Sequence, residues 1–409
     1  MNKSFQSGNR VRIIDSIRGF SLLGILLCNM LIFQYGMYGK DQLHFFGLSN
    51  WDLAMDQVLL IVAERSFMPI FMFLFGYSLF KLRDRLAQSG FTPWRSLVRR
   101  FSLLIVLGML HGFYLWDGDI LLPYGAIGFL LLLFVKRKAK TLVIWSAVLS
   151  ALFVGSSLLA IASPNEEVGN KDAKIDAYIE RSITVIGQGS YSDIIKFRAE
   201  DPTLLNKGIG SKILLGFVAM PIMLLPMFLL GIAAAKKGWF HNPHQERRRY
   251  WLMVGWLIPL GAGLKSVCVL LLHDKTWSAG LIEFGGQLLA LGYIGAFALA
   301  LSHLSSSSFF RIAFESVGRL SLTNYLMQSA ICTTLFYGYG LGWFGKIGIT
   351  YGILLAIVIY SFQAIASSFM LRYVQYGPLE YLLRIWTYFS FKGKPRLSKT
   401  VVSDKTVNL

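Results

Sequence analysis

Residues 101–140 read FSLLIVLGMLHGFYLWDGDILLPYGAIGFLLLLFVKRKAK, in which the short polar turn WDGD joins two apolar runs and a basic cluster follows the second. Each run approaches the roughly 20 residues that an α-helix needs to cross a hydrocarbon core of about 30 Å. Lys and Arg are enriched in the cytoplasmic loops of membrane proteins. The stretch therefore predicts two membrane-crossing helices, with the WDGD turn outside and the basic cluster inside.

The composition of the whole chain favours the same class of protein. Of the 409 residues 55% are hydrophobic and 15% are charged, and the mean hydropathy is +0.54. These values exclude an ordinary water-soluble domain and predict an all-α polytopic membrane bundle. The net charge of +18 comes from short Lys and Arg clusters between apolar runs. This positive-inside pattern indicates membrane lipids as partners and argues against nucleic acid.

About ten apolar segments are long enough to be predicted as spans. They are residues 17–37, 60–80, 101–117, 119–135, 141–162, 212–235, 250–272, 279–303, 319–339 and 347–371. Basic loops follow the second, fourth and sixth of them, whereas the intervening short loops are nearly free of Lys and Arg. The alternation predicts one transmembrane domain over 1–400 with both termini in the cytoplasm.

Three segments fall outside the predicted spans. Residues 163–211 carry mixed charges with helical spacing in places, which predicts an extracytoplasmic segment of short amphipathic helices, although a solvated linker fits equally well. Residues 374–392 pair apolar and aromatic residues with basic ones, as in a helix that lies in the headgroup region. Residues 395–409 are predicted to form a cytoplasmic tail.

Polar residues at membrane depth are the candidate functional residues, because burying them in lipid is costly. Asn29 lies eleven residues after Arg18, and His111 lies eleven residues after Arg100. At 1.5 Å per residue, both lie ~16 Å from the inner boundary, near the midplane. A midplane imidazole is suited to act as a general base or proton relay, and a neutral histidine bonded to a neighbouring helix is the alternative.

Further polar residues are predicted in two layers. The same arithmetic places Arg65, Lys265 and Glu283 ~24–30 Å from the inner side, where Glu64 and the aspartates of the WDGD turn complete an outer cluster. We predict substrate contacts for a set from this outer side: Asp119, Trp116, Tyr124, Glu64 and Arg65. For Glu64 and Arg65 the alternative is an ion pair at the membrane interface. Asp117 is predicted to orient His111. The alternative is that both aspartates shape a solvated turn and cap the next helix. Arg18, Arg100 and Arg319 are predicted to form a basic ring at the inner edge.

Asn324 and Gln328 lie one turn apart in the ninth predicted span, which suits either hydrogen bonds between helices or a ligand. The three cysteines all fall inside apolar runs, so neither a disulfide framework nor a thiolate metal site is predicted. We find no P-loop, no strand-flanked GxGxxG, no HExxH and no CxxC pair. ATP hydrolysis and metal-based redox chemistry are therefore not favoured.

Five blocks of sequence resemble one bacterial family. They are DSIRGFSLLGILLCNM, SFMPIFMFLFGYSLF, RRFSLLIVLGMLHGFYLWDGDILLPYGAIG, GRLSLTNYLMQSAICTTLFYGYGLG and QYGPLEYLLRIWTY. Together they are similar to the YeiB-type family, domain of unknown function 418, over residues 12–388. The resemblance implies a multi-pass protein of the bacterial cytoplasmic (inner) membrane, of a kind often described as transporters without an established substrate.

That family is grouped with transmembrane acyltransferases, and the segment IRGFSLLGILLCN resembles the first span of the acyltransferase-3 enzymes. In those enzymes the segment ends in histidine, whereas here it ends in Asn29. The resemblance implies an acyl-CoA donor held by Arg18, Arg100 and Arg319, and no tightly bound cofactor. His111 would then replace the missing histidine as the base, and Asn29 would stabilise the oxyanion.

The resulting hypothesis is transfer of an acyl group from cytoplasmic acyl-CoA to an extracytoplasmic hydroxyl or amine, such as that of a glycan or a small molecule. The alternative is a transporter of a small solute or lipid-linked molecule that uses the same outer cluster. A third hypothesis, lipid binding or scaffolding, gives the cluster no function. The sequence leaves a homodimer open.

Overall fold

The apolar runs fold as helices, and no strand occurs among the residues that the computed structural model describes. These residues are 12–90, 92–159, 168–200, 209–272, 277–305 and 307–393. The predicted tail, residues 395–409, lies outside them, as do parts of the predicted outer segment 163–211. An all-α architecture follows for the described chain, as the composition predicts.

The helices follow one another with short connections. In chain order they are α1 Arg12–Gly39, η1 Leu43–Phe46, α2 Asn50–Val62, α3 Phe67–Gln88, α4 Pro93–Leu110, η2 His111–Leu115, α5 Leu121–Phe134, α6 Ala139–Leu159, α7 Val168–Gln188, α8 Tyr191–Ala199, α9 Ile209–Lys236, α10 Arg247–Leu252, η4 Met253–Leu257, α11 Ile258–Leu271, α12 Ser278–His303, α13 Phe309–Arg319, α14 Ser321–Phe336, α15 Ile349–Tyr373 and α16 Pro378–Tyr388. The segments η2 and η4 are π-helical turns.

Eight helices in the described part of the chain are long and apolar enough to cross a membrane, fewer than the ten predicted. Two predicted spans are shorter than expected. The WDGD turn delays the start of α5, which keeps 14 residues. A break at Leu320 delays the start of α14, which keeps 16. At 1.5 Å per residue these helices rise ~21 and ~24 Å, less than the roughly 30 Å of a hydrocarbon core.

The second predicted span, 60–80, is also divided. The chain forms α2 up to Val62, leaves the helix over residues 63–66, and resumes as α3 at Phe67. The helical path over Asn50–Gln88 is 39 residues long in all. The break between α2 and α3 therefore lies inside an apolar stretch, and it carries Glu64 and Arg65.

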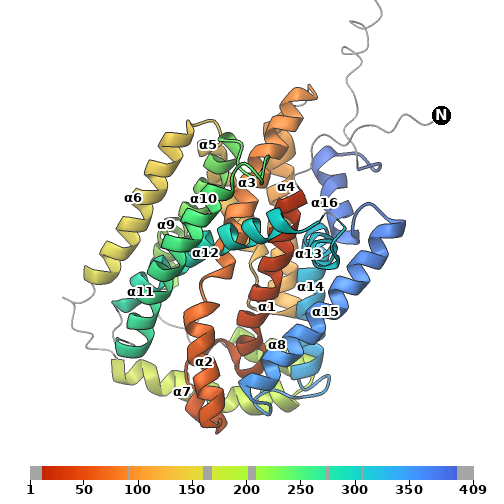
Figure 1. The fold of residues 1–409 in the computed structure, drawn as a ribbon. Coiled ribbons are helices and arrows are strands. Elements are labelled where there is room, and N and C mark those ends of the chain that lie inside the picture. Colours follow the sequence, from red (N-terminus) through yellow and green to blue (C-terminus); the bar gives the residue numbers. More distant parts are fainter. Residues whose placement is uncertain are drawn as a thin grey trace, which may run out of the picture.

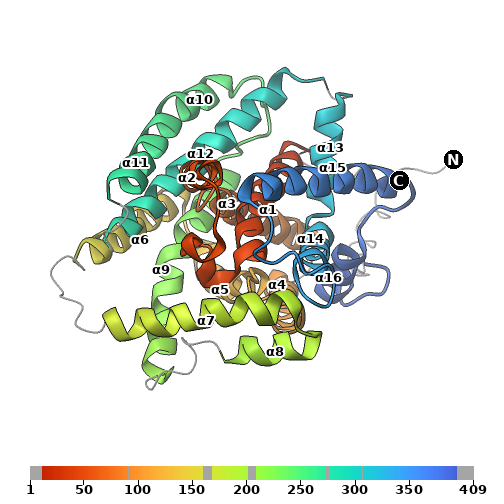
Figure 2. The ribbon, with the colours of Figure 1, turned by 90° about the horizontal axis from the view of Figure 1, so that it is seen from below.

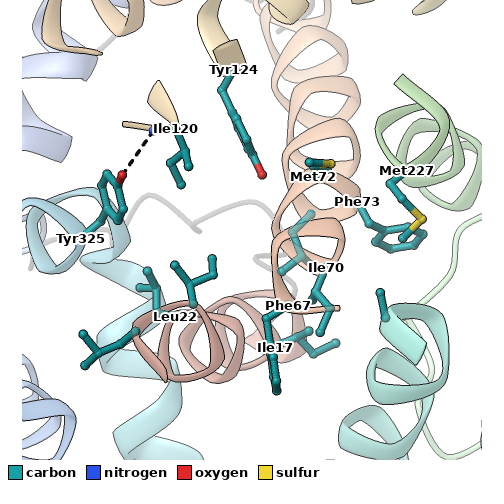
Figure 3. Packing of buried hydrophobic residues seen from close by; sticks show 14 of the residues in the cluster. Ile17, Leu22, Phe67, Ile70, Met72, Phe73, Ile120, Tyr124, Met227 and Tyr325 are labelled. Atoms are coloured by element: carbon teal, nitrogen blue, oxygen red, sulfur yellow. Dashed lines mark hydrogen bonds between the residues drawn. The ribbon is translucent and has the colours of Figure 1, made fainter. Parts of the chain in front are cut away.

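Helix α1 occupies the middle of the bundle, with α3, α13, α14 and α15 packed against it (Figure 1). The core around α1 is built from buried aliphatic and aromatic side chains. Figure 3 shows Leu22 of α1 near Ile120 and Tyr325, and Ile17 near Ile70 of α3. This packing fixes the relative positions of α1, the WDGD turn and α14.

Two helices lie across one end of the bundle. We call this the outer end, because it contains the WDGD turn that the loop charges predict to be outside. Helices α7 and α8 run along it (Figures 1 and 2). At the opposite end α16 lies against α4 and α14, within the range 374–392 predicted as an interfacial helix. Its burial of Leu383 and Thr387 shows which face packs on the bundle.

Candidate functional site

The helix α4 changes to a π-helical turn at His111. The segment η2 follows α4 directly, and the backbone N–H of Trp116 donates to the carbonyl of His111 at 2.8 Å. Trp116 itself is extended, with φ −157° and ψ 128°, so the chain leaves the helix and turns back toward α5. Single π-helical turns inside α-helices are frequent at functional sites.

His111 and Asp119 form a buried hydrogen-bonded pair across this turn. His111 Nδ1 lies 2.8 Å from Asp119 Oδ1, and the two side chains are 0% and 6% exposed. The other carboxylate oxygen accepts a hydrogen bond from the backbone N–H of Leu122 at 2.8 Å. Because an ionised carboxylate only accepts, Nδ1 carries a proton, and in a neutral ring Nε2 then carries the lone pair. Asp119 thus sets both the tautomer and the orientation of the ring.

Two buried polar atoms of this site lack a partner. Neither His111 Nε2 nor Trp116 Nε1 has a hydrogen-bond partner among the described residues, and the two ring centroids lie 6.2 Å apart. Unsatisfied buried polar atoms are rare, because each costs ~1–3 kcal/mol. Nε2 is an acceptor and the indole N–H is a donor. One hydroxyl group placed between them would satisfy both.

Tyr325 of α14 closes another side of the site. Its ring centroid lies 5.3 Å from that of His111. Its hydroxyl donates to the carbonyl of Gly118 at 3.3 Å and accepts from the N–H of Ile120 at 3.2 Å (Figure 3). The tyrosine therefore holds the backbone of the WDGD turn on both sides of Asp119.

Helix α8 covers the site from the outer end. Arg198 donates to the carbonyl of Gly112 and, at 3.5 Å, to that of Leu115. Its guanidinium also lies 3.8 Å from the carboxylate of Asp117. The prediction that Asp117 orients His111 was therefore wrong. The extra residue of the π-turn and the extended Trp116 direct Asp117 outward to Arg198 and bring Asp119 to the imidazole.

A narrow pocket opens at the outer end beside Asp117 and Arg198. The pocket is small, with a cavity volume of about 20 Å³, which is room for about one water molecule. Tyr178 of α7, Tyr337 and the last turn of α1 also line it. Asp117 directly follows Trp116 in the chain, so the pocket adjoins the His111 site.

Asn29 lies on the face of α1 that looks toward the site. It is half-buried and precedes Phe33 by one helical turn, and the Phe33 ring stacks on Trp116 with centroids 4.2 Å apart. The structure gives no contact between Asn29 and His111. Its role as an oxyanion donor stays a prediction.

The other predicted outer residues gather at the break between α2 and α3, which we call the α2–α3 break (residues 63–66). Lys265 of α11 donates to the carbonyl of Glu64 at 2.5 Å and to Ser66 Oγ at 3.2 Å. Arg65 lies 3.8 Å from the carboxylate of Glu283 in α12. Among the described residues, no hydrogen bond or ion pair links these groups to His111 or Asp119. The single outer cluster that the sequence predicts is therefore two separate groups.

The inner arginines differ in what they contact. Arg18 pairs with Asp15 at 2.9 Å and donates to Ser78 at 2.7 Å, and Arg319 reaches the carbonyl of Gln375 at 3.4 Å. Both hold neighbouring helices together. Arg100 has no hydrogen bond or ion pair in the described part of the chain, although Tyr388, Arg18, Arg384 and Glu380 lie within electrostatic range. Of the three, Arg100 is the one with free donors for an anion.

Comparison with known proteins supports the resemblance seen in the sequence. The chain is 33% identical to "Uncharacterized protein YxaH" of Bacillus subtilis (strain 168), over 97% of this chain and 98% of that protein. The family model described as protein of unknown function (DUF418) matches residues 234–390. The chain belongs to the DUF418 family. It is also 29% identical to "Uncharacterized protein YeiB" of Escherichia coli (strain K12), over 95% of this chain and 98% of that protein.

No solved structure matches the chain. The DUF418 model covers α10 to α16 and so includes Lys265, Glu283 and Tyr325 but neither His111 nor Asp119. The bacterial relatives match over nearly their whole length, which supports a multi-pass membrane protein.

In this DUF418 protein three further predicted residues have packing partners. Asn324 donates to Ser367 Oγ at 3.0 Å, and Gln328 donates to Gln363 at 2.9 Å, so both join α14 to α15. These contacts favour the helix–helix alternative. The hydroxyl of Tyr124 reaches the carbonyl of Met68 at 3.4 Å, and Figure 3 shows the tyrosine among the buried core residues.

The sequence did not single out Arg198 or Tyr325 as residues of the site. Arg198 is one of several charged residues in an amphipathic segment, and only its place on α8 distinguishes it. Tyr325 stands one position after Asn324 in the same predicted span, and only the fold shows that its ring lies beside His111. Among the described residues, no three His, Cys, Asp or Glu side chains come together as metal ligands would.

Proposed function

We propose that the protein transfers an acyl group from acyl-CoA at the inner side of the membrane to a hydroxyl or amine acceptor at the outer side. One observation carries the proposal: the His111 imidazole is buried and held through Nδ1 by Asp119, while Nε2 has no partner. This is the arrangement of a general base whose tautomer is set by a carboxylate. The resemblance to transmembrane acyltransferases supports the same reaction.

The step uses His111 as both base and acid. The acceptor hydroxyl gives its proton to Nε2 while its oxygen attacks the thioester carbonyl. The carbon–sulfur bond then breaks, and the proton passes from Nε2 to the leaving thiolate. The products are an acylated acceptor and coenzyme A. Asn29 is our candidate donor to the oxyanion, and the indole N–H of Trp116 donates a hydrogen bond to the reacting oxygen of the acceptor.

Arg100 is the residue best placed to bind the donor's phosphates. It lies eleven residues before His111 on the same helix, so ~16 Å and about three turns separate them on one face. Its guanidinium has no partner within the described residues, and an arginine with free donors suits phosphate oxygens. At the other end, the small pocket beside Asp117 marks the side from which we expect the acceptor to approach.

The test uses purified protein in proteoliposomes with acetyl-CoA as the donor probe and glucosamine, which carries hydroxyls and an amine, as the acceptor probe. We expect release of free coenzyme A thiol and an acetylated product by mass spectrometry. His111→Ala should abolish both, whereas His303→Ala, at an exposed histidine, should retain them. Equal thiol release by the wild type and His111→Ala would contradict the proposal.

Transport is the second candidate function, and the α2–α3 break favours it. Transporters bind substrates and ions at discontinuous helices near the membrane midplane. The break here joins charged groups from several helices. A transporter would move a labelled solute across the proteoliposome membrane in a pH-dependent manner and leave no acylated product, so the same preparation separates the two candidates.

A further inference from the structure

Helix α16 packs against α4 at the end of the bundle opposite α7 and α8 (Figure 1). The guanidinium of Arg99 in α4 lies 4.7 Å from the centre of the Phe389 ring, directly after α16. Arg384 and Tyr388, one turn apart on α16, both lie within electrostatic range of Arg100. The surroundings of Arg100 therefore include two residues of α16 that the proposed function does not use.

Aromatic rings hold the Arg384 side chain in place. Its guanidinium lies 4.2 Å from the centre of the Tyr376 ring and 5.3 Å from that of the Tyr388 ring. Its Nε donates to the carbonyl of Gly393 at 3.2 Å. Its two terminal nitrogens have no hydrogen bond or ion pair to any residue that the structure describes. Arg384 is thus a positioned cation with free donors.

The carboxylates of this region are already bonded to other groups. Asp15 pairs with Arg18 at 2.9 Å. Glu380 accepts from the N–H groups of Leu322 and Thr323 at 2.8 and 3.0 Å and from the Thr323 hydroxyl at 2.6 Å, so it caps the start of α14. Three guanidinium groups therefore lie with two carboxylates, and one positive charge is unbalanced.

The unbalanced charge falls on the two arginines that lack a bonded carboxylate, Arg100 and Arg384. Both are half-buried, and like charges within range of each other repel. An anion placed between them would replace this repulsion with attraction. The Tyr388 hydroxyl, which has no hydrogen bond within the described ranges, adds a neutral donor beside them.

A phosphate group matches these donors better than a carboxylate does. The planar guanidinium presents paired N–H groups at the spacing of phosphate oxygens. A carboxylate has only two oxygens, whereas a phosphomonoester or a diphosphate offers three or more to the three side chains. This difference favours the phosphates of coenzyme A over the diester of a phospholipid head group, although both present the same chemical group at the inner side.

We propose that Arg384 and Tyr388 of α16 form, together with Arg100 of α4, a phosphate-binding site between the two helices. The proposal rests on the proposed function for the source of the phosphate, which is acyl-CoA. It adds α16 as the second wall of the donor site. Arg384 binds the donor and takes no part in the chemistry at His111.

Ligand binding to the full chain in phosphatidylcholine nanodiscs tests the site. Calorimetry compares coenzyme A with pantetheine, which lacks the phosphates and the adenosine. Arg384→Gln should lose about tenfold or more in affinity for coenzyme A, because hydrogen bonds to charged groups are the strong ones, and should bind pantetheine as the wild type does. Arg95→Gln removes the same charge from an exposed position on α4 and should leave both affinities unchanged.

A milder variant separates loss of binding from loss of folding. Tyr388→Phe keeps the ring beside Arg384 and removes only the hydroxyl. We expect an unchanged Tm and a loss of about threefold in affinity for coenzyme A, as for one hydrogen bond of ordinary strength. If Arg384→Gln lowers the Tm, an affinity for coenzyme A in Tyr388→Phe equal to that of the wild type would overturn the proposal.

Native mass spectrometry with added phosphatidylglycerol separates the two sources of phosphate. Loss of bound lipid in Arg384→Gln, with unchanged affinity for coenzyme A, would support the phosphate site and assign it to the membrane instead of the donor. Equal binding of both ligands by the wild type, Arg384→Gln and Arg95→Gln, or no binding by the wild type, would overturn the proposal. Arg384-dependent binding of coenzyme A without acetyl transfer would contradict the proposed function alone.

Discussion

The His111 site and the α2–α3 break place buried ionisable groups in the membrane domain in opposite ways. At the His111 site the two ionisable groups come from one helical hairpin, eight residues apart, and bond directly at 2.8 Å. At the break the charges come from the break itself, α11 and α12, and Lys265 donates to the Glu64 carbonyl and to Ser66 Oγ rather than to a carboxylate. The first arrangement fixes one side chain in a single orientation. The second gathers charged groups from several helices at a discontinuity of the backbone.

The largest expected effect comes from replacing Asp119, the second of the two aspartates of the WDGD turn. Asp119→Asn keeps the size of the side chain but removes the carboxylate that sets the tautomer of His111. We expect its rate of acyl transfer to fall about 10²- to 10⁴-fold. Asp117→Asn, the matched control, should stay within a few-fold of wild type, because Asp117 contacts Arg198 and not the imidazole. Equal losses in both variants would remove the distinction between the two aspartates.

More of the helical hairpin that carries His111 and Asp119 could be predicted from the sequence than of the α2–α3 break. Spacing placed His111 near the midplane and both aspartates in the following turn. The error lay in which aspartate bonds the ring, because no residue pattern announces the π-helical turn or the extended Trp116. If a regular α-helical period is continued through this segment, the predicted direction of the Asp117 side chain is wrong.

The α2–α3 break could not be predicted from the sequence, for a different physical reason. Within the stretch LLIVAERSFMPIF, the break falls at the sequence AERS, which contains neither Gly nor Pro. The apolar pattern on both sides of it therefore predicts one continuous span. The contacts at the end of α2 are tertiary: Tyr293 donates to the carbonyl of Val62, Lys265 donates to that of Glu64 in the break, and Gly286 leaves room for the Arg65 backbone. Those partners lie some 200 residues or more along the chain, and no local signal connects them.

A substitution at Gly286 should affect the break more than the hairpin. Gly286→Val places a branched side chain against the Arg65 carbonyl, and overpacking of this kind costs ~1–3 kcal/mol. We expect a lower Tm of the purified protein and faster hydrogen exchange over residues 59–68. Gly263→Ala in α11 is the control, because no atom lies within 4 Å of a Cβ there. An unchanged Tm in Gly286→Val would show that the close approach does not support the break.

A smaller effect is expected where α8 covers the hairpin. Arg198→Met keeps the length of the side chain but removes its hydrogen bonds to the carbonyls of Gly112 and Leu115. Exchange over residues 111–118 should speed up while the break is unaffected. Arg181→Met, at an exposed pair with Glu200, should change little, since exposed ion pairs contribute ~0–1 kcal/mol. Faster exchange at the break in Arg198→Met would mean that the two regions are coupled.

The smallest effect concerns the first turn of α8. Hydrogen bonds from the side chain and backbone of Ser190 lower the pKa of Asp193 below its ordinary value. A carboxyl group with a lowered pKa stabilises the folded state above its unfolded pKa, and this contribution is lost as pH falls through the folded value. Exchange in residues 190–195 should therefore rise below about pH 4. In Asp193→Asn the acid dependence should disappear, and its persistence would assign the effect to another group.

The most direct test of the central claim, that His111 and Asp119 act as one catalytic unit, is a double-mutant cycle on the rate of acetyl transfer from acetyl-CoA. The four proteins are the wild type, His111→Ala, Asp119→Asn and the double variant. Residues that act as a unit are strongly non-additive, so the double variant should be no slower than His111→Ala alone. Losses that multiply, or a wild-type rate in either single variant, would contradict the claim.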